Sequence, residues 1–236
     1  MEKKELLYEG KAKKVYTTEN PEQLIVSYKD DATAFDGQKK GTIVGKGAIN
    51  NRMTNHIFKL LEKKGVPTHL VEELNDRETV VKKVEIVPLE VIIRNFSAGS
   101  FAKKLGMEEG IKLACPTLEF SYKNDDLHDP FINSYYALAL KLATQEEIDV
   151  ITKYAFVVNE VMREYFAGLG IELIDFKIEF GRLADGTVIL ADEVSPDTCR
   201  LWDKETHEKL DKDRFRRDLG NVEDAYQEVF RRLGIQ

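Results

Sequence analysis

The feature that most restricts the fold of this 236-residue chain is a strict alternation of residue types between positions 174 and 180, followed closely by a turn signal. The segment reads Ile-Asp-Phe-Lys-Ile-Glu-Phe, so a strand would place its four apolar side chains on one face and Asp175, Lys177 and Glu179 on the other. An Asp-Gly pair follows at positions 185–186 and is typical of a two-residue hairpin turn. We therefore expect a β-hairpin with one charged face.

The register of this hairpin suggests a metal site. With a two-residue loop, Glu179 lies directly opposite Asp192, and directly opposed carboxylates repel each other. A divalent cation would remove this repulsion, and Mg²⁺ is usually bound by one or two carboxylates together with substrate phosphates. A loop longer by one residue would break the pairing, and the second strand is apolar on both faces. The alternative is a half-exposed strand whose charged face is solvated.

Composition excludes several classes of protein. The chain has 35 Lys and Arg against 42 Asp and Glu, a net charge of −7, so we expect no nucleic acid as the main partner, although a local basic pocket is allowed. A hydrophobic fraction of 42% indicates a globular protein with a core. We see neither a membrane-spanning apolar run nor a signal peptide, so we expect no membrane partner and a cytoplasmic location. Cys115 and Cys199 are expected to be free thiols.

The order of the predicted elements indicates an α+β fold. Short strands are expected near residues 6–8, 13–17, 24–28, 69–74 and 79–84. A helix is expected over residues 49–61, and a longer one begins at Thr144, where Glu147 completes a capping box. A last helix is expected over residues 222–233. We expect two lobes, residues 1–85 and 86–236, with a ligand cleft between them.

Two segments carry groups that suit phosphate binding. An apolar stretch ends at Arg94, and Ser100 follows a turn of small residues, so a guanidinium, a hydroxyl and free amides come together. Lys11 and Lys13 lie in a turn between two predicted strands, as in loops that cover nucleotide phosphates. The alternatives are an arginine paired with a surface carboxylate and a lysine-rich surface hairpin.

Two later segments add polar groups. Residues 192–203 are expected to leave the hairpin as a loop that presents Ser195, Asp197 and Arg200. The charged run 204–218 is expected to be solvated, with Arg214 and Arg216 as its members able to reach a phosphate.

In combination, these segments resemble the SAICAR synthetase family of purine biosynthesis over essentially the whole chain. The resemblance lies in Tyr-Glu-Gly-Lys-Ala-Lys at 8–13, the segment 94–100, Asp-Phe-Lys-Ile-Glu-Phe-Gly at 175–181, Ser-Pro-Asp at 195–197 and Arg-Leu-Trp-Asp at 200–203. It implies an ATP-dependent ligase that joins the carboxylate of the imidazole ribonucleotide CAIR to the amino group of L-aspartate, forming SAICAR, ADP and phosphate. It also implies a fold related to ATP-grasp enzymes, with a kinase-like N-terminal β lobe and a larger α/β lobe.

The resemblance also implies roles for individual residues. The ATP phosphates would contact Lys11, Ala12 and Lys13, and the rest of the nucleotide would contact Lys82, Val84 and Ile86. Mg²⁺ would bind Glu179 and Asp192. CAIR would bind Arg94, Ser100, Asp175, Lys177, Arg200 and Arg216. Asp175 and Lys177 are the candidate catalytic residues. The expected reaction proceeds through an acyl phosphate, which the amine of aspartate then attacks.

Three other functions remain open from the sequence. They are a small-molecule phosphotransferase with a hydroxyl acceptor, a ligase for a different carboxylate or amine, and a non-catalytic nucleotide-binding module. We expect a homodimer only because homodimers are common among soluble enzymes. The sequence does not indicate which residues bind L-aspartate.

Overall fold

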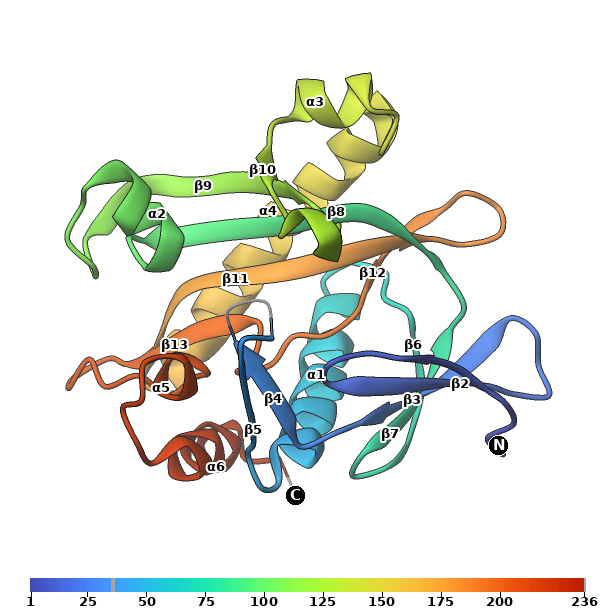
Figure 1. Cartoon of the computed structure of the whole chain (residues 1–236), viewed down its shortest axis with the longest axis horizontal. Helices are drawn as coiled ribbons and strands as arrows, with labels where there is room; N and C mark the ends of the chain where they lie inside the picture. The colour runs from blue at the N-terminus through green and yellow to red at the C-terminus, as the bar shows by residue number, and fades with distance from the viewer. Residues whose placement is uncertain (35–36, 236) are drawn as a thin grey trace.

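Two antiparallel sheets, each covered by one long helix, form the framework of the protein (Figure 1). The structure is a computed structural model and describes residues 1–34 and 37–235. The first sheet has the order β1 (Leu6–Glu9), β2 (Lys13–Thr17), β3 (Gln23–Tyr28), β7 (Glu78–Lys82) and β6 (Leu70–Asn75). Helix α1 (Lys46–Glu62) packs against β3, β6 and β7.

The second sheet is built around one long strand. Its strands are β10 (Phe131–Ile132), β9 (Lys112–Tyr122), β8 (Glu85–Phe96), β11 (Ile171–Arg182), β12 (Val188–Ala191) and β13 (Cys199–Asp203). One edge of β11 pairs with β8, whereas its other edge pairs with β13 near its start and with β12 near its end. The chain between β12 and β13 therefore leaves the sheet beside the middle of β11.

The remaining elements are short, apart from two helices. They are β4 (Asp31–Ala34), β5 (Lys39–Thr42), α2 (Gly99–Leu105), the 3₁₀ helix η1 (Asp125–Leu127), α3 (Ser134–Ala139), α4 (Gln145–Gly168), α5 (Asp213–Arg216) and α6 (Val222–Leu233). The three predicted helices are thus confirmed, as is the α+β class. Strands β4, β5, β9 and β10 were not predicted. The helix over residues 99–105 was not predicted either, and one expectation was wrong, because residues 199–203 form a strand and not a loop.

The main core lies between α4 and the second sheet and continues to α1. The apolar stripe of α4 is buried and consists of Ile148, Ile151, Ala155, Val158, Met162 and Phe166. Helical spacing places these side chains on one face. Among the described residues, no helix combines the length and apolar character needed to cross a membrane.

The hairpin of β11 and β12 has a different register from the predicted one. Leu183 N–H donates to the Thr187 carbonyl at 2.9 Å, which leaves a loop of three residues rather than two, and Gly186 has a φ of 86°. A three-residue loop with glycine in the left-handed region is a common hairpin connection. Glu179 consequently lies opposite Ala191, and Asp192 comes directly after the end of β12. The predicted Glu179–Asp192 pairing is therefore wrong.

The start of α4 matches the predicted capping box. The Glu147 amide donates to Thr144 Oγ1 at 3.2 Å, and the Thr144 amide donates to Glu147 Oε2 at 2.8 Å. Two amides that the helix itself leaves without partners are thereby satisfied.

We expect Thr144→Ala to lower the free energy of unfolding by about 1 kcal/mol, because one amide of the first turn loses its acceptor. Urea denaturation followed by circular dichroism measures this change. Gln145→Ala is the control, since it removes only an exposed bond to Asp149 and should cost less than about 0.5 kcal/mol. Equal effects of the two substitutions would contradict the role of the cap.

Candidate functional site

A cavity of about 600 Å³ lies between the two sheets, and nine of the predicted site residues line it. These are Lys11, Ala12, Lys13, Lys82, Val84, Ile86, Lys177, Glu179 and Asp192. Strands β2, β3 and β7 contribute the apolar side chains Val15, Leu24, Val26 and Val81. Strands β8 and β11 and the segments after β9 and β12 contribute most of the charged side chains, whereas Lys11, Lys13 and Lys82 come from the side of the first sheet. The cavity thus combines a mainly apolar wall that carries lysines with a charged wall.

Glu179 is held in the charged wall by two lysines. Its Oε1 atom lies 3.0 Å from Lys123 Nζ and 3.1 Å from Lys177 Nζ. Lys177 Nζ also lies 2.6 Å from Glu90 Oε1, and Glu90 is the direct partner of Glu179 on β8. Burial favours the neutral amine of Lys177, but Glu179 and Glu90 together raise its pKa above the usual range. Lys177 is therefore a permanent cation.

Asp192 is paired with Lys13, the first residue of β2. Its Oδ1 atom accepts from Lys13 Nζ at 2.5 Å, and Glu193 Oε2 lies 3.4 Å from the same ammonium. Asp192 has a φ of 59°, a left-handed conformation that aspartate adopts more readily than most residues. Burial opposes ionisation, but the Lys13 and Lys177 ammonium groups lower the pKa of Asp192 to about 2. Asp192 is therefore a carboxylate at neutral pH.

A second charged cluster lies around Asp175 on the same face of β11. Asp175 is paired in register with Arg94 on β8 and with Arg200 on β13. Its Oδ2 atom lies 2.6 Å from Arg94 Nη1 and 2.9 Å from Arg200 Nη1. Arg94 Nη2 also donates to Ser100 Oγ at 3.4 Å. The predicted substrate-binding residues near β11 thus come together.

Asp213 joins Arg216 to this cluster. Asp213 Oδ2 accepts from Arg200 Nε at 2.8 Å, and Asp213 Oδ1 accepts from Arg216 Nη1 at 2.7 Å. Arg214 instead donates to the Gly220 carbonyl at 2.7 Å and to Glu208 at 2.8 Å. The prediction that residues 204–218 are solvated is wrong at Leu210, Asp211, Asp213 and Arg214, which are buried.

Gly99 allows the backbone to approach this cluster closely. A Cβ atom at this position would lie 2.4 Å from Arg200 Nη2, and the residue has a φ of 53°. Both facts favour glycine at this position. The start of α2 therefore lies directly against a guanidinium of the cluster.

Several residues of the site had no predicted role, among them His69, Glu90, Lys123 and Asp213. Glu90 had a signal, since it is the one carboxylate in the otherwise apolar run 86–93. Burial lowers the pKa of His69 to about 3, so this residue of the cavity wall is neutral. Only the tertiary structure reveals Lys123 and Asp213 as partners of site residues.

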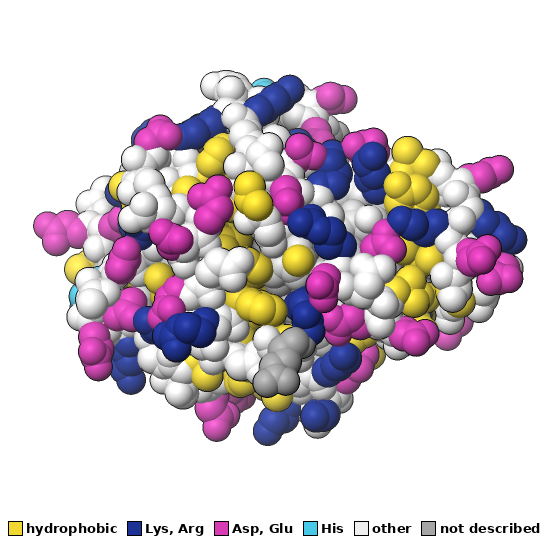
Figure 2. Space-filling model, turned by 90° about the horizontal axis from the view of Figure 1, so that it is seen from below, with side chains coloured by type: hydrophobic (Ala, Val, Ile, Leu, Met, Phe, Trp, Pro, Cys, Tyr) yellow, Lys and Arg dark blue, Asp and Glu magenta, His cyan; other side chains and the backbone are white. Residues whose placement is uncertain are grey.

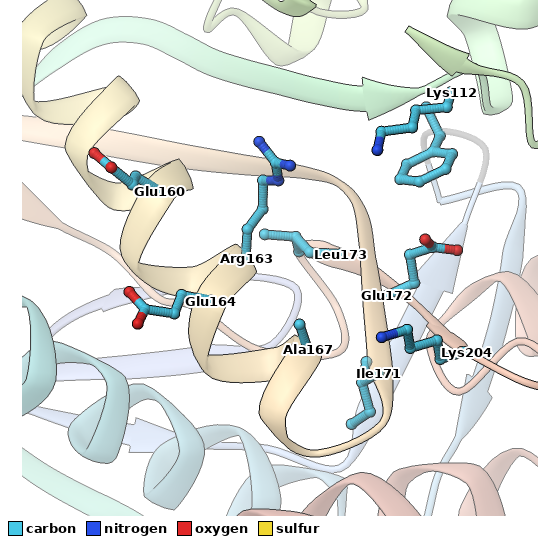
Figure 3. Close-up of a pocket in the computed structure, with 10 residues that line it drawn as sticks. Lys112, Glu160, Arg163, Glu164, Ala167, Ile171, Glu172, Leu173 and Lys204 are labelled. Atoms are coloured by element: carbon cyan, nitrogen blue, oxygen red, sulfur yellow. The ribbon is translucent and has the colours of Figure 1, made fainter.

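A separate cavity of about 530 Å³ lies beside α4 and contains none of the predicted site residues (Figure 3). Arg163 of α4, Lys112 of β9 and Glu172 of β11 are among the residues that line it. On the face in Figure 2, basic and acidic side chains alternate without a continuous patch of one sign among the described residues. Such a surface does not indicate a nucleic-acid interface.

We expect Asp192→Asn to reduce stability by about 2 kcal/mol at pH 7, because a folded-state pKa near 2 lies below the usual ~3.9. A lowered pKa stabilises the fold above pH ~4, and this contribution is lost as the pH falls from about 4 to 2. Urea unfolding at pH 7, 5 and 3 measures the difference between wild type and variant. The difference should shrink at pH 3, and a constant difference would contradict the Lys13–Asp192 pairing.

The SAICAR synthetase family model matches residues 6–233 of the chain. The phosphoribosylaminoimidazole-succinocarboxamide synthase of Lachnoclostridium phytofermentans is 77% identical over 236 residues, which is 100% of both chains. The crystal structure of the enzyme of this name from Ehrlichia chaffeensis has a TM-score of 0.96 and 43% identity, and covers 98% of this chain and 99% of that one. A SAICAR synthetase solved in complex with ADP has a TM-score of 0.92 and 48% identity, with 95% and 96% coverage.

Proposed function

The chain belongs to the SAICAR synthetase family of ATP-dependent ligases in purine biosynthesis, and we propose that it joins CAIR to L-aspartate with release of ADP and phosphate. The observation that carries this proposal is the arrangement along β11, where Asp175, Lys177 and Glu179 connect a cluster of arginines to a mixed apolar and charged cavity. A phosphorylated carboxylate and a nucleotide can thus meet at one strand. A cytoplasmic location and a homodimer remain expectations from the sequence.

In this proposal the cavity holds ATP and residues 1–85 form the nucleotide-binding lobe. The turn between β1 and β2 is closed by a bond from Gly10 N–H to the Lys13 carbonyl at 2.8 Å. This turn carries Lys11 and Lys13 to the cavity, where their charges suit phosphate oxygens. Val84 lies in the connection between the sheets and Ile86 near the start of β8, and both would bound the adenine.

Two of the five acidic residues that line the cavity fit a bound Mg²⁺. Glu179 and Asp192 are hard oxygen ligands that line the same cavity, and each is paired with a lysine. Among the residues that the structure describes, no group of three or more His, Cys, Asp or Glu side chains is arranged to hold a metal. Nucleotide oxygens would therefore complete the ligand set. The ion would neutralise charge that develops on the phosphates.

CAIR would bind at the second cluster through its phosphate. Arg94, Arg200 and Arg216 supply guanidinium donors, and Ser100 supplies a hydroxyl. Asp175 and Asp213 hold these guanidinium groups in position. With the phosphate there, the imidazole carboxylate would extend along β11 toward Lys177, whose ammonium attracts it.

The reaction would then take two steps. A carboxylate oxygen of CAIR attacks the γ-phosphorus of ATP, the bond to the β-phosphate oxygen breaks, and an acyl phosphate and ADP result. The amine of L-aspartate attacks the acyl carbon, phosphate leaves with that carboxylate oxygen, and the amine loses a proton. Lys13 and Lys177 would stabilise the negative charge by fixed electrostatics. The hairpin of Lys11 and Lys13 would limit access of water to the acyl phosphate.

Phosphate release distinguishes this function from its rivals. We expect release of phosphate from Mg-ATP only when CAIR and L-aspartate are both present. Formation of the acyl phosphate requires CAIR, and its conversion to product requires L-aspartate. With carboxyl-¹⁸O CAIR, one labelled oxygen should appear in the phosphate, which mass spectrometry detects. Transfer to a hydroxyl acceptor without phosphate release would indicate a phosphotransferase, and unlabelled phosphate would exclude the acyl-phosphate route.

We expect Asp213→Asn to raise KM for CAIR about tenfold, because Arg200 and Arg216 both lose a charged acceptor worth roughly 1.5–3 kcal/mol. KM for ATP should change by less than about twofold. Initial rates with each substrate varied in turn measure these constants. Asp218→Asn is the control, since that carboxylate is exposed and pairs with Lys39. An unchanged KM for CAIR would show that Asp213 does not contribute to CAIR binding.

A further inference from the structure

A buried set of charges connects the two clusters of the site, and one of its lysines is incompletely paired. Asp197 lies at its centre with a side chain only 4% exposed. Asp197 Oδ2 accepts from Lys46 Nζ at 2.8 Å, and Asp197 Oδ1 accepts from the Tyr226 hydroxyl at 2.6 Å. Each oxygen of this carboxylate therefore already has a close donor.

Lys212 is the second cation beside Asp197. Its Nζ lies 3.5 Å from Asp197 Oδ2, beyond the distance of a good charged hydrogen bond, and its side chain is only 14% exposed. Burial, reinforced by the nearby positive charges of Arg216 and Lys46, lowers the pKa of Lys212. An additional anion would stabilise the ammonium form of Lys212 in this position.

Lys212 lies near both parts of the site, the arginine cluster and the cavity. Its backbone N–H donates to the Pro196 carbonyl at 3.0 Å, and its carbonyl accepts from Arg216 N–H at 2.9 Å, one helical turn away. On the other side, Glu193 is close enough to Asp197 and Lys46 for their charges to affect its pKa, and it contacts Lys13. Lys212 is thus close to Arg216 of the arginine cluster and also to Glu193, which contacts Lys13 at the cavity.

The proposed reaction brings three anionic substrates together at this place. The arginine cluster suits the phosphate of CAIR, and Lys11 and Lys13 suit the phosphates of ATP. L-Aspartate carries two carboxylates, and its amine must reach the carboxylate of CAIR between these ends. A cation close to both parts of the site suits one of its carboxylates.

We propose that the Lys212 ammonium binds a carboxylate of L-aspartate and thereby positions the amine for attack. This inference rests on the proposed function and names a residue for its third substrate. Asp197, Lys46 and Tyr226 then act as positioning residues that hold the Lys212 side chain in place. Arg216, on the same side of the turn, remains assigned to CAIR.

Steady-state kinetics of Lys212→Met tests the proposal. We expect KM for L-aspartate and the inhibition constant of succinate, a dicarboxylate without the amine, to rise about tenfold to a hundredfold. KM for CAIR and ATP should change by less than about twofold. Lys212→Arg keeps the charge and should recover part of the loss. Lys204→Met is the control, because Lys204 is exposed in the separate cavity of Figure 3.

Two outcomes would overturn the proposal. One is an unchanged KM for L-aspartate in folded Lys212→Met, and the other is an equal rise of KM for all three substrates. Wild-type protein provides a test that does not depend on the folding of a variant. L-Aspartate should protect Lys212, but not Lys204, from reductive methylation measured by mass spectrometry, and absent protection would refute the assignment. Failure of wild type to release phosphate with all three substrates would instead refute the proposed function.

Discussion

Neutralisation of the charges on β11 is the constraint on which the rest of the site depends. Asp175 and Glu179 are almost fully buried in the middle of a sheet, and a buried carboxylate without a partner is strongly destabilising. Each therefore needs cations from neighbouring segments. Arg94 and Arg200 supply them to Asp175, while Lys123 and Lys177 supply them to Glu179. These pairings help to fix where β8 and β13 lie against β11.

The same pairings give the site its preorganised electrostatics. Arg200 contacts one carboxylate on β11 and a second one, Asp213, beyond β13, so its guanidinium has little freedom to move. Lys13 is held in a similar way by Asp192 and Glu193. Donors fixed in advance stabilise developing charge without a cost of reorganisation. The ion pairs of the fold are thus also the groups that suit phosphates and carboxylates.

Local patterns predicted much of the structure, and they failed where the loop geometry or distant partners decided it. The alternation over 174–180 correctly placed Asp175 and Glu179 on one face, and the capping box correctly placed the start of α4. The register of the hairpin was wrong because its loop has three residues, with Gly186 in the left-handed region. A change of one residue in a loop moves every facing pair, and neither loop length was excluded by the Asp-Gly signal.

Local patterns in the sequence predicted which residues form the charged site, and the match to one family over nearly the whole chain determined the reaction class. The sequence suffices for this because alternation, caps and motifs depend only on neighbours along the chain. The tertiary structure alone decided that Asp213 joins two arginines and that Lys212 lies incompletely paired beside Asp197. In the sequence, both residues belong to an ordinary charged run. Burial and pairing depend on segments far apart in the chain, so only the folded structure distinguishes these two residues from solvated neighbours.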